Sequence, residues 1–168
     1  MANMKKSVIF ILLALPIMVY AQDKPAPVQE ELKYGVGAAA GFSTGYGLSF
    51  RYWPSDWGIQ LTTAPYYSNN DAQISFGTTV LKTIKNDGRI KLFMYWGNHI
   101  LYEKYSYYYD YYEEETEKYT TWISGIGPGF EFTFLDKVSF NLMFGIATYI
   151  DGDFMLNMTA ETGLYYMF

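Results

Sequence analysis

Residues 120–134 read TTWISGIGPGFEFTF, and residues 138–150, three positions further on, read VSFNLMFGIATYI. In both stretches large apolar side chains recur at every second position, with glycine, serine, threonine or another small or polar residue between many of them. A period of two is typical of a β-strand with one apolar face, whereas an amphipathic helix repeats every three to four residues. The short turn at residues 135–137 (LDK) then predicts an antiparallel hairpin.

The same alternation covers most of residues 34–168, and no segment there has apolar residues at helical spacing over a useful length. Most of the alternating runs are bounded by residues that favour turns. We therefore predict an all-β protein with eight strands, at about residues 34–42, 45–53, 57–67, 72–82, 89–102, 120–134, 138–150 and 158–168.

Composition narrows the classes of function. Charged residues make up 17% of the chain, below the globular norm of about 25%, while aromatic residues reach 20%, so the chain is too apolar for disorder. Cysteine is absent, which excludes disulfides, thiolate metal sites and cysteine nucleophiles. The net charge of −5 makes nucleic-acid binding a poor hypothesis.

The N-terminal part differs from the rest of the chain. Lys5 and Lys6 precede an apolar run of about a dozen residues, too short for a transmembrane helix of about twenty. This pattern predicts a secretory signal peptide over residues 1–21, which is cleaved. Residues 22–33 (QDKPAPVQEELK) predict a short periplasmic tail, and residues 34–168 form the single folded domain.

The two faces of the predicted strands distinguish two kinds of barrel. One face carries Leu, Ile, Val, Phe, Tyr and Trp, and the other carries mainly Gly, Ser, Thr, Ala, Gln and Asn with few charges. A soluble barrel needs a charged outer face, whereas a narrow membrane barrel encloses small and polar residues and turns its apolar band to lipid. We predict an eight-stranded antiparallel up-and-down transmembrane β-barrel, with a soluble lipocalin-like binder as the alternative.

The predicted connections support this topology. Short turns at 54–56, 85–88 and 135–137 belong to the periplasmic end, if the N-terminus is periplasmic. The outer connections are residues 43–44, 68–71, 103–119 and 151–157, so the longest one is extracellular. Aromatic side chains gather near both ends, as membrane girdles do: Trp53, Trp57, Tyr66, Tyr67, Tyr102 and Trp122.

Together these features resemble the small eight-stranded outer-membrane barrels of the OmpX and OmpA transmembrane-domain type. The resemblance rests on the signal peptide, on glycine-alternating strands such as YGVG at 34–37 and GIGPGFE at 125–131, and on the ending GLYYMF at 163–168. It implies an OmpX-like, porin-family protein of the bacterial outer membrane, in contact with lipid and lipopolysaccharide. It also implies that the barrel-assembly machinery reads Tyr166 and Phe168 as a signal.

Four charged side chains fall on the inward face of their strands: Arg51, Lys91, Glu131 and Glu161. A charge in a narrow lumen is costly unless it is paired, so we expect ion pairs among them. A hairpin centred on Tyr111 would place Lys91 opposite Glu131. The network either satisfies inward polar groups or, as the resemblance suggests, forms a gate. Eight strands leave an interior about filled by side chains, which argues against a wide pore.

His99, the single histidine, shares the inward phase of Lys91. A lipid hydrolase needs a nucleophile and a base within reach of lipid, and no His-x-Ser pattern is present, because Ile100 and Leu101 follow. We expect a satisfied interior or rim histidine and no catalytic residue. One histidine without cysteine leaves only carboxylates as further metal ligands, so we predict neither a metal site nor a cofactor.

The segment from residue 102 to 119 is the most unusual part of the chain, with eight tyrosines and six acidic residues against Lys104 and Lys118. Tyrosine supplies a large amphipathic contact area at low entropy cost, and its β propensity predicts a ribbon that continues the flanking strands above the membrane. The candidate interaction residues are Tyr105, Tyr107, Tyr108, Tyr109, Tyr111, Tyr112, Glu113, Glu114, Glu115 and Glu117. The alternative is an acidic loop that only solvates the rim, or meets lipopolysaccharide head groups through divalent ions.

We therefore expect a non-enzymatic outer-membrane barrel with a structural or adhesion-like role through residues 103–119. The partner would be an unknown extracellular protein or surface ligand. A small channel and a lipid-modifying outer-membrane enzyme are the functional alternatives.

Overall fold

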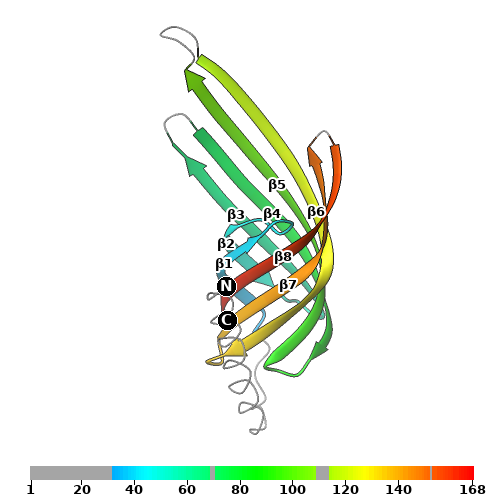
Figure 1. Ribbon diagram of the computed structural model, residues 1–168. Coiled ribbons are helices and arrows are strands. Elements are labelled where there is room, and N and C mark those ends of the chain that lie inside the picture. Colours follow the sequence, from blue (N-terminus) through cyan, green and yellow to red (C-terminus); the bar gives the residue numbers. More distant parts are fainter. Residues whose placement is uncertain (1–31, 69–70, 109–113, 152) are drawn as a thin grey trace, which may run out of the picture.

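The computed structural model describes residues 32–68, 71–108, 114–151 and 153–168. Eight strands pair in sequence order and close into one antiparallel barrel (Figure 1). They are β1 (Tyr34–Gly41), β2 (Gly47–Tyr52), β3 (Trp57–Tyr67), β4 (Asp71–Asn86), β5 (Ile90–Tyr108), β6 (Glu114–Phe134), β7 (Val138–Asp151) and β8 (Asp153–Met167). The predicted signal peptide and most of the predicted tail lie outside the described residues. Among the described residues, no helix is long and apolar enough to span a membrane.

Pairing between the first and last strands closes the barrel. Tyr34 N donates to Phe168 O at 3.0 Å, and Phe168 N donates to Tyr34 O at 2.8 Å. The register of β5 with β6 places Lys91 opposite Glu131, as the predicted hairpin requires. Closure satisfies the backbone groups that an open sheet would leave at its edges, which is a condition for spanning lipid with strands.

The barrel is apolar outside and largely polar inside. Large apolar side chains are exposed on the outward face of every strand, among them Val36, Leu48, Ile59, Phe76, Trp96, Ile126, Phe144 and Leu164. Inward positions bury polar and charged side chains, including Arg51, Gln60, Thr62, His99, Asn141 and Glu161. A soluble domain shows the opposite distribution, so the fold is that of an outer-membrane-type barrel.

Large side chains fill part of the lumen. Leu81, Phe93, Tyr95, Met143 and Tyr165 are each at most 1% exposed. Trp53, which we expected in an aromatic girdle, is also buried and packs with them. The reason is its phase, because Trp53 follows Ser49 and Arg51 along the inward side of the chain.

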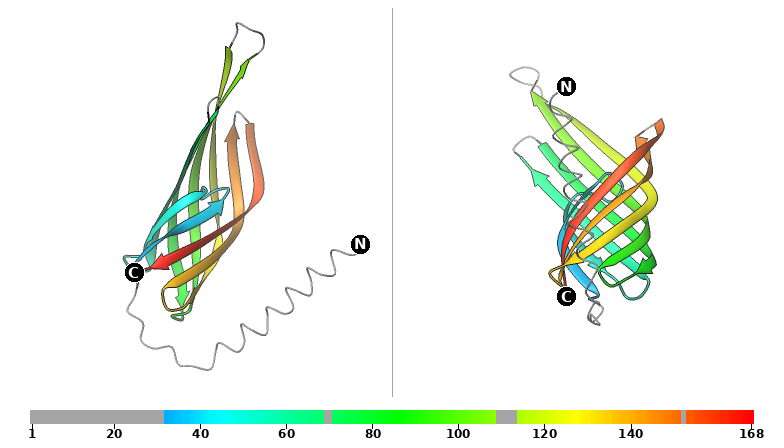
Figure 2. Two further views of the ribbon diagram at one scale, coloured as in Figure 1. Left: turned by 90° about the vertical axis from the view of Figure 1, so that its left-hand side faces the viewer. Right: turned by 60° about the horizontal axis from the view of Figure 1, so that its bottom comes forward.

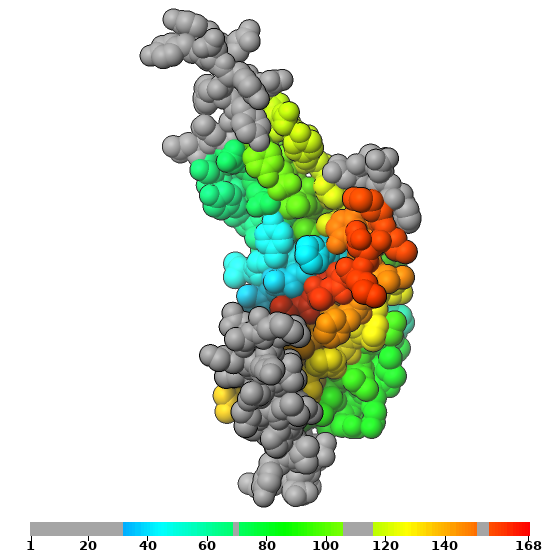
Figure 3. Space-filling model, viewed as in Figure 1, coloured from blue at the N-terminus to red at the C-terminus, as the bar shows by residue number. Residues whose placement is uncertain are grey.

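The outer end of the barrel is uneven in height. β5 and β6 remain paired as far as Tyr108 and Glu114, and they rise far beyond the short β1–β2 hairpin (Figure 2). Figure 3 shows the green and yellow-green part of this hairpin standing above the cyan β2. This continuation agrees with the predicted ribbon.

Several predicted boundaries differ from the structure. β4 runs to Asn86, four residues beyond its expected end, so it takes in part of the turn expected at 85–88. The expected connection at 151–157 is mostly strand, because β8 begins at Asp153 and pairs with β7 from there on, although polar residues interrupt its alternation. β2 is shorter than expected, because the chain just before it leaves the wall of the barrel and enters the lumen.

Candidate functional site

Arg51 and Glu131 form an ion pair across the lumen, in its periplasmic half. Arg51 comes from β2 and Glu131 from β6, and their side chains are 0% and 3% exposed. The guanidinium also donates to Gln60 Oε1 and lies 4.1 Å from the ring centroid of Tyr165. A buried ion pair is tolerated when further polar contacts bind its remaining atoms. We call these four residues the ion-pair layer, and together they fill this section of the lumen.

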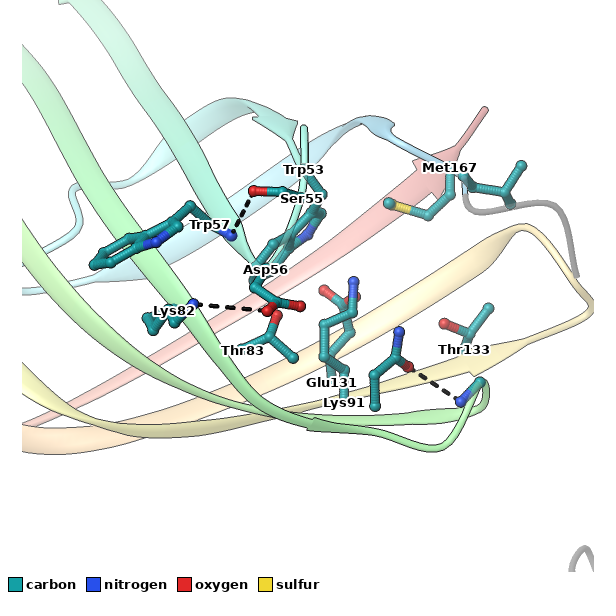
Figure 4. Close-up of a pocket in the computed structure, with 13 residues that line it drawn as sticks. Trp53, Ser55, Asp56, Trp57, Lys82, Thr83, Lys91, Glu131, Thr133 and Met167 are labelled. Carbon is teal, nitrogen blue, oxygen red and sulfur yellow. Dashed lines mark hydrogen bonds and ion pairs between the residues drawn. The ribbon is translucent and has the colours of Figure 1, made fainter.

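A cavity of about 410 Å³ lies at the end of the barrel that carries the short turns, which we expect to be the periplasmic end. Lys91 and Glu131 lie side by side in its wall (Figure 4). Lys91 Nζ is 4.1 Å from the ring centroid of Trp53, and Lys82 Nζ is 3.7 Å from Asp56 Oδ2 at the rim. Because acidic and basic side chains both line this cavity, it does not select one sign of charge.

The connection between β1 and β2, residues 42–46, folds into the outer half of the lumen, and we call it the lumen plug. Ser43 and Thr44 are fully buried, although we expected them in an external connection. Gly45 turns the chain inward with a φ of 77°, which a glycine adopts without strain. The glycine at position 77 of β4 makes room for the plug, because any side chain there would collide with the backbone of Thr44.

Glu161 of β8 holds the lumen plug in place. Its carboxylate accepts hydrogen bonds from the Ser43 backbone N (3.1 Å) and Oγ (2.6 Å), and from the Thr44 backbone N (3.3 Å) and Oγ1 (2.6 Å). Thr159 Oγ1 donates a fifth hydrogen bond at 2.6 Å. Amide and hydroxyl donors therefore take the role that we expected of a basic side chain. The structure brings Arg51, Lys91 and Glu131 together and places Glu161 apart from them.

His99 also binds the lumen plug. It is 2% exposed, with Nδ1 2.8 Å from Phe42 O and Nε2 2.9 Å from Ser75 Oγ. In the tautomer that donates from Nδ1, Nε2 accepts from Ser75, as a catalytic base accepts from its nucleophile. Ser75 is fully buried, however, and its Oγ also accepts from Tyr46 N at 3.2 Å. The pair is inaccessible to a substrate and fastens the plug to the wall.

The predicted interaction residues divide at the limit of the described chain. Register pairs in β5 and β6 hold six of them: Tyr105 with Glu117, Tyr107 with Glu115, and Tyr108 with Glu114. The other four lie outside the described residues: Tyr109, Tyr111, Tyr112 and Glu113. We call residues 103–108 and 114–119 the outer ribbon.

The two faces of the outer ribbon differ in charge. On the lumen-side face, Tyr105 Oη donates to Glu103 Oε1 at 2.9 Å, and Tyr119 Oη donates to Glu117 Oε2 at 2.8 Å. Gln73 Nε2 of β4 donates a second hydrogen bond to Glu103 Oε1, at 2.7 Å. Lys104 and Lys118 lie opposite each other, one residue out of phase with these acids, and so occupy the outward face. Near the barrel, the alternation thus places Glu103, Tyr105, Glu117 and Tyr119 on one face of the outer ribbon and Lys104 and Lys118 on the other.

The predicted assembly-signal residues lie on the outer surface at the periplasmic end. Tyr166 and Phe168 are each about half exposed. The Phe168 ring stacks on Tyr34 with centroids 5.9 Å apart, next to the two backbone hydrogen bonds that close the barrel. Phe168 therefore contributes directly to the seam between β1 and β8.

Sequence reasoning identified the four lumen charges and missed the lumen plug with its contacts. Ser75 and His99 are 24 positions apart, and Ser43 and Glu161 are 118 apart, so no local motif joins them. The available signal was the close spacing of glycines around Ser43 and Thr44, together with Gly77, Gly97 and Gly125 at inward positions of three successive strands.

Comparison with known proteins gives fold-level similarity. No protein-family model matches the chain, and no curated protein matches its sequence. Among solved structures, the N-terminal β-barrel domain of Pseudomonas aeruginosa OprF is 13% identical with a TM-score of 0.49, and the alignment covers 81% of this chain and 96% of that one. Ail, the attachment invasion locus protein of Yersinia pestis, is 15% identical with a TM-score of 0.48, covering 81% and 97%. Neisserial surface protein A is 12% identical with a TM-score of 0.41, covering 81% and 95%.

Proposed function

We propose that this closed barrel is an integral, multi-pass protein of the bacterial outer membrane, exported by its signal peptide, that acts in recognition at the cell surface. The observation that carries the recognition role is the outer ribbon, which rises beyond the short β1–β2 hairpin with Glu103, Tyr105, Glu117 and Tyr119 on its lumen-side face. The proposed partner is an extracellular protein or surface ligand with a basic, extended segment.

The outward face of the barrel supports the membrane location. Large apolar side chains cover it on all eight strands, and a soluble protein does not expose so continuous an apolar surface. Outer-membrane lipid and lipopolysaccharide are then the surroundings of the barrel. The exposed Phe168 at the closing seam supports a role for the barrel-assembly machinery in insertion.

The edge of β6 supports a partner that binds as a strand. Register pairs between β6 and β7 begin at Trp122 and Ile150, so residues 114–121 of β6 extend beyond β7. An extended segment can bind beside a sheet by adding a strand, and we propose this mode for the partner. Glu103 and Glu117 on the lumen-side face would then favour basic side chains in the added strand.

The filled lumen favours this role over those of a channel or an enzyme. The ion-pair layer and the lumen plug occupy the lumen at two levels, and ion flow would require both to move. Ser75 and His99 have the contact of a nucleophile and a base, but with 0% and 2% exposure they meet no substrate. We therefore propose a non-enzymatic protein that conducts few or no ions.

The test compares cells that express the wild type with cells that express a shortened barrel, in which Asn-Gly joins Lys104 to Lys118 as a two-residue hairpin turn. The probe is a surface coated with a synthetic peptide of alternating lysine and valine. We expect attachment of the wild type and its loss in the shortened barrel, although both give a folded barrel in the outer-membrane fraction.

Two charge variants serve as matched controls. Glu103→Gln with Glu117→Gln should weaken attachment, because it neutralises the acidic face, whereas Lys104→Gln with Lys118→Gln should leave it unchanged. Equal attachment by the wild type and the shortened barrel would refute the recognition role and leave the ribbon as an acidic rim. Cleavage of the wild type by a Glu-specific protease on intact cells, confined to the ribbon, would establish that it faces outwards.

A further inference from the structure

A row of polar side chains crosses the lipid-facing wall of the barrel. Register pairs connect Thr78 of β4 to Asn98 of β5, Asn98 to Ser124 of β6, and Ser124 to Thr148 of β7. All four occupy outward positions, in phase with exposed apolar side chains two residues away on their strands, and all four are half-buried. We call them the polar row.

Apolar rows border the polar row on both sides. On the periplasmic side lie Val80, Trp96, Ile126 and Ile146, and on the outer side lie Phe76, Ile100, Trp122 and Ile150. These eight side chains are each 40–56% exposed. The polar row is therefore inside the apolar band of the wall and not at its edge.

A hollow of about 300 Å³ lies at the end of the polar row formed by Ser124 and Thr148. Trp96, Ile126, Ile146 and Leu156 form its apolar sides, and Ser124 and Thr148 contribute its hydroxyl groups. The outer surface is recessed at Ser124 and Thr148, because their side chains are smaller than the isoleucine and tryptophan side chains around them.

The polar row can still form hydrogen bonds with a ligand. Thr148 Oγ1 donates to Ser124 O at 3.3 Å, and Ser124 Oγ donates to Gly97 O at 3.4 Å and accepts from Trp96 Nε1 at 3.2 Å. Both hydroxyl hydrogens are therefore used, and each hydroxyl oxygen keeps acceptor capacity. Within the described part of the chain, no hydrogen bond binds the side-chain amide of Asn98. An amide facing hydrocarbon is costly unless a neighbouring molecule binds it.

The depth of the hollow indicates which part of a lipid it meets. Along one strand, successive outward positions are about 5 Å apart along the membrane normal, since two residues advance about 6.6 Å at a tilt of about 40°. Register partners on tilted strands differ in height, so the depth is taken at Ser124 alone, which lines the hollow and is one outward position below Trp122 on β6. Ser124 therefore faces acyl chains of the outer leaflet a few carbons below their head group.

We propose that the hollow binds an acyl chain of an outer-leaflet lipid that carries a hydroxyl group a few carbons below its head group. The apolar sides hold the chain, and the lipid hydroxyl donates to Ser124 Oγ or Thr148 Oγ1, with the Asn98 amide next to Ser124 in the polar row. This inference rests on the membrane location proposed above. A second copy of the barrel fits less well, because two rigid convex walls would leave their hollows facing each other unfilled, whereas a flexible chain fills one.

The test measures lipid retention by native mass spectrometry on the folded barrel in detergent. The probes are lipid A, whose acyl chains carry 3-hydroxyl groups and esters, and phosphatidylethanolamine, which has no oxygen at that depth. The variant is Asn98→Leu/Ser124→Leu/Thr148→Leu, which suits lipid and fills the hollow. The matched control is Thr162→Leu. Thr162 carries an outward hydroxyl on β8, which donates to Asn141 O at 3.1 Å, and it does not line the hollow.

We expect one lipid A per wild-type barrel, and about five- to tenfold weaker retention by the triple variant, from the loss of a hydrogen bond in lipid. The Thr162→Leu control should behave as the wild type. Equal retention of both lipids, or unchanged retention by the triple variant, would overturn the proposal while the membrane location stands. A dimer lost in the triple variant would overturn it in favour of a second copy. Failure of the wild type to insert into bilayers would instead refute the membrane location.

Discussion

The buried ion pair between Arg51 and Glu131 predicts a large loss of stability when one partner is removed. Arg51→Met leaves the Glu131 carboxylate, 3% exposed, without its guanidinium in the lumen. Removal of one partner from a buried pair costs about 3–5 kcal/mol, most of which is the penalty for the remaining buried charge. Replacement of both residues by methionine removes that charge as well, so the double variant should be more stable than Arg51→Met alone.

An exposed ion pair gives the matched control. Lys82 and Asp56 are 3.7 Å apart with side chains 41% and 74% exposed, so Lys82→Met should cost about 0–1 kcal/mol because water screens the pair. Lys91 is the register partner of Glu131 and lines the same cavity, so its charge should move the cost of Arg51→Met towards the lower end of its expected range.

The assay is reversible urea unfolding of each variant in lipid vesicles, followed by tryptophan fluorescence and by the shift between folded and unfolded bands on gels. From the four unfolding free energies, a double-mutant cycle gives the coupling energy of the pair. Two results would refute the assignment of a desolvated, charge-compensated pair. One is a loss of unfolding free energy below about 1 kcal/mol for Arg51→Met. The other is a loss in the double variant that exceeds the sum of the losses in the two single variants.

Three further variants test other parts of the structure. Glu161→Ala removes the acceptor of five hydrogen bonds, so amide hydrogen exchange at Ser43 should accelerate about tenfold or more, and unchanged protection would contradict the role of Glu161 in holding the plug. Gly77→Val should expel the lumen plug, because the new side chain occupies the space of its backbone, and planar-bilayer recordings should then show more frequent small openings than the wild type gives. Deletion of Phe168 should lower the yield of folded barrel in the outer membrane and its resistance to urea, since two backbone hydrogen bonds and one ring contact at the seam are lost. Unchanged yield and stability would show that Phe168 is needed neither for assembly nor for closure of the barrel.

The barrel wall was largely predictable from the sequence, because the pattern that defines each strand lies in consecutive residues. A period of two assigns each side chain to a face as soon as the strand is recognised, and it correctly placed Arg51, Lys91, Glu131 and Glu161 inside. The register of β5 with β6 followed from a hairpin centred on Tyr111. The same local reasoning misjudged the start of β8, because polar residues do not prevent main-chain pairing in a hairpin.

The candidate sites were predictable only in part. The outer ribbon was identified from its tyrosines and acids, and alternation implies that Lys104 and Lys118 face away from Glu103 and Glu117. The polar row was not identified, because its members lie on four strands and become neighbours only through three registers at once. The acceptor for Ser43 and Thr44 was equally hidden, since Glu161 reaches them from the other end of the chain.

Side-chain alternation along single strands was enough to predict the eight strands, the inverted apolar surface and the set of charges in the lumen. It could not predict which inward groups meet, namely Arg51 with Glu131, Glu161 with the lumen plug, and His99 with Ser75. These contacts depend on how the barrel closes. The number of strands and the stagger of their registers determine which residues of distant strands face each other across the lumen. A local sequence pattern does not contain this stagger.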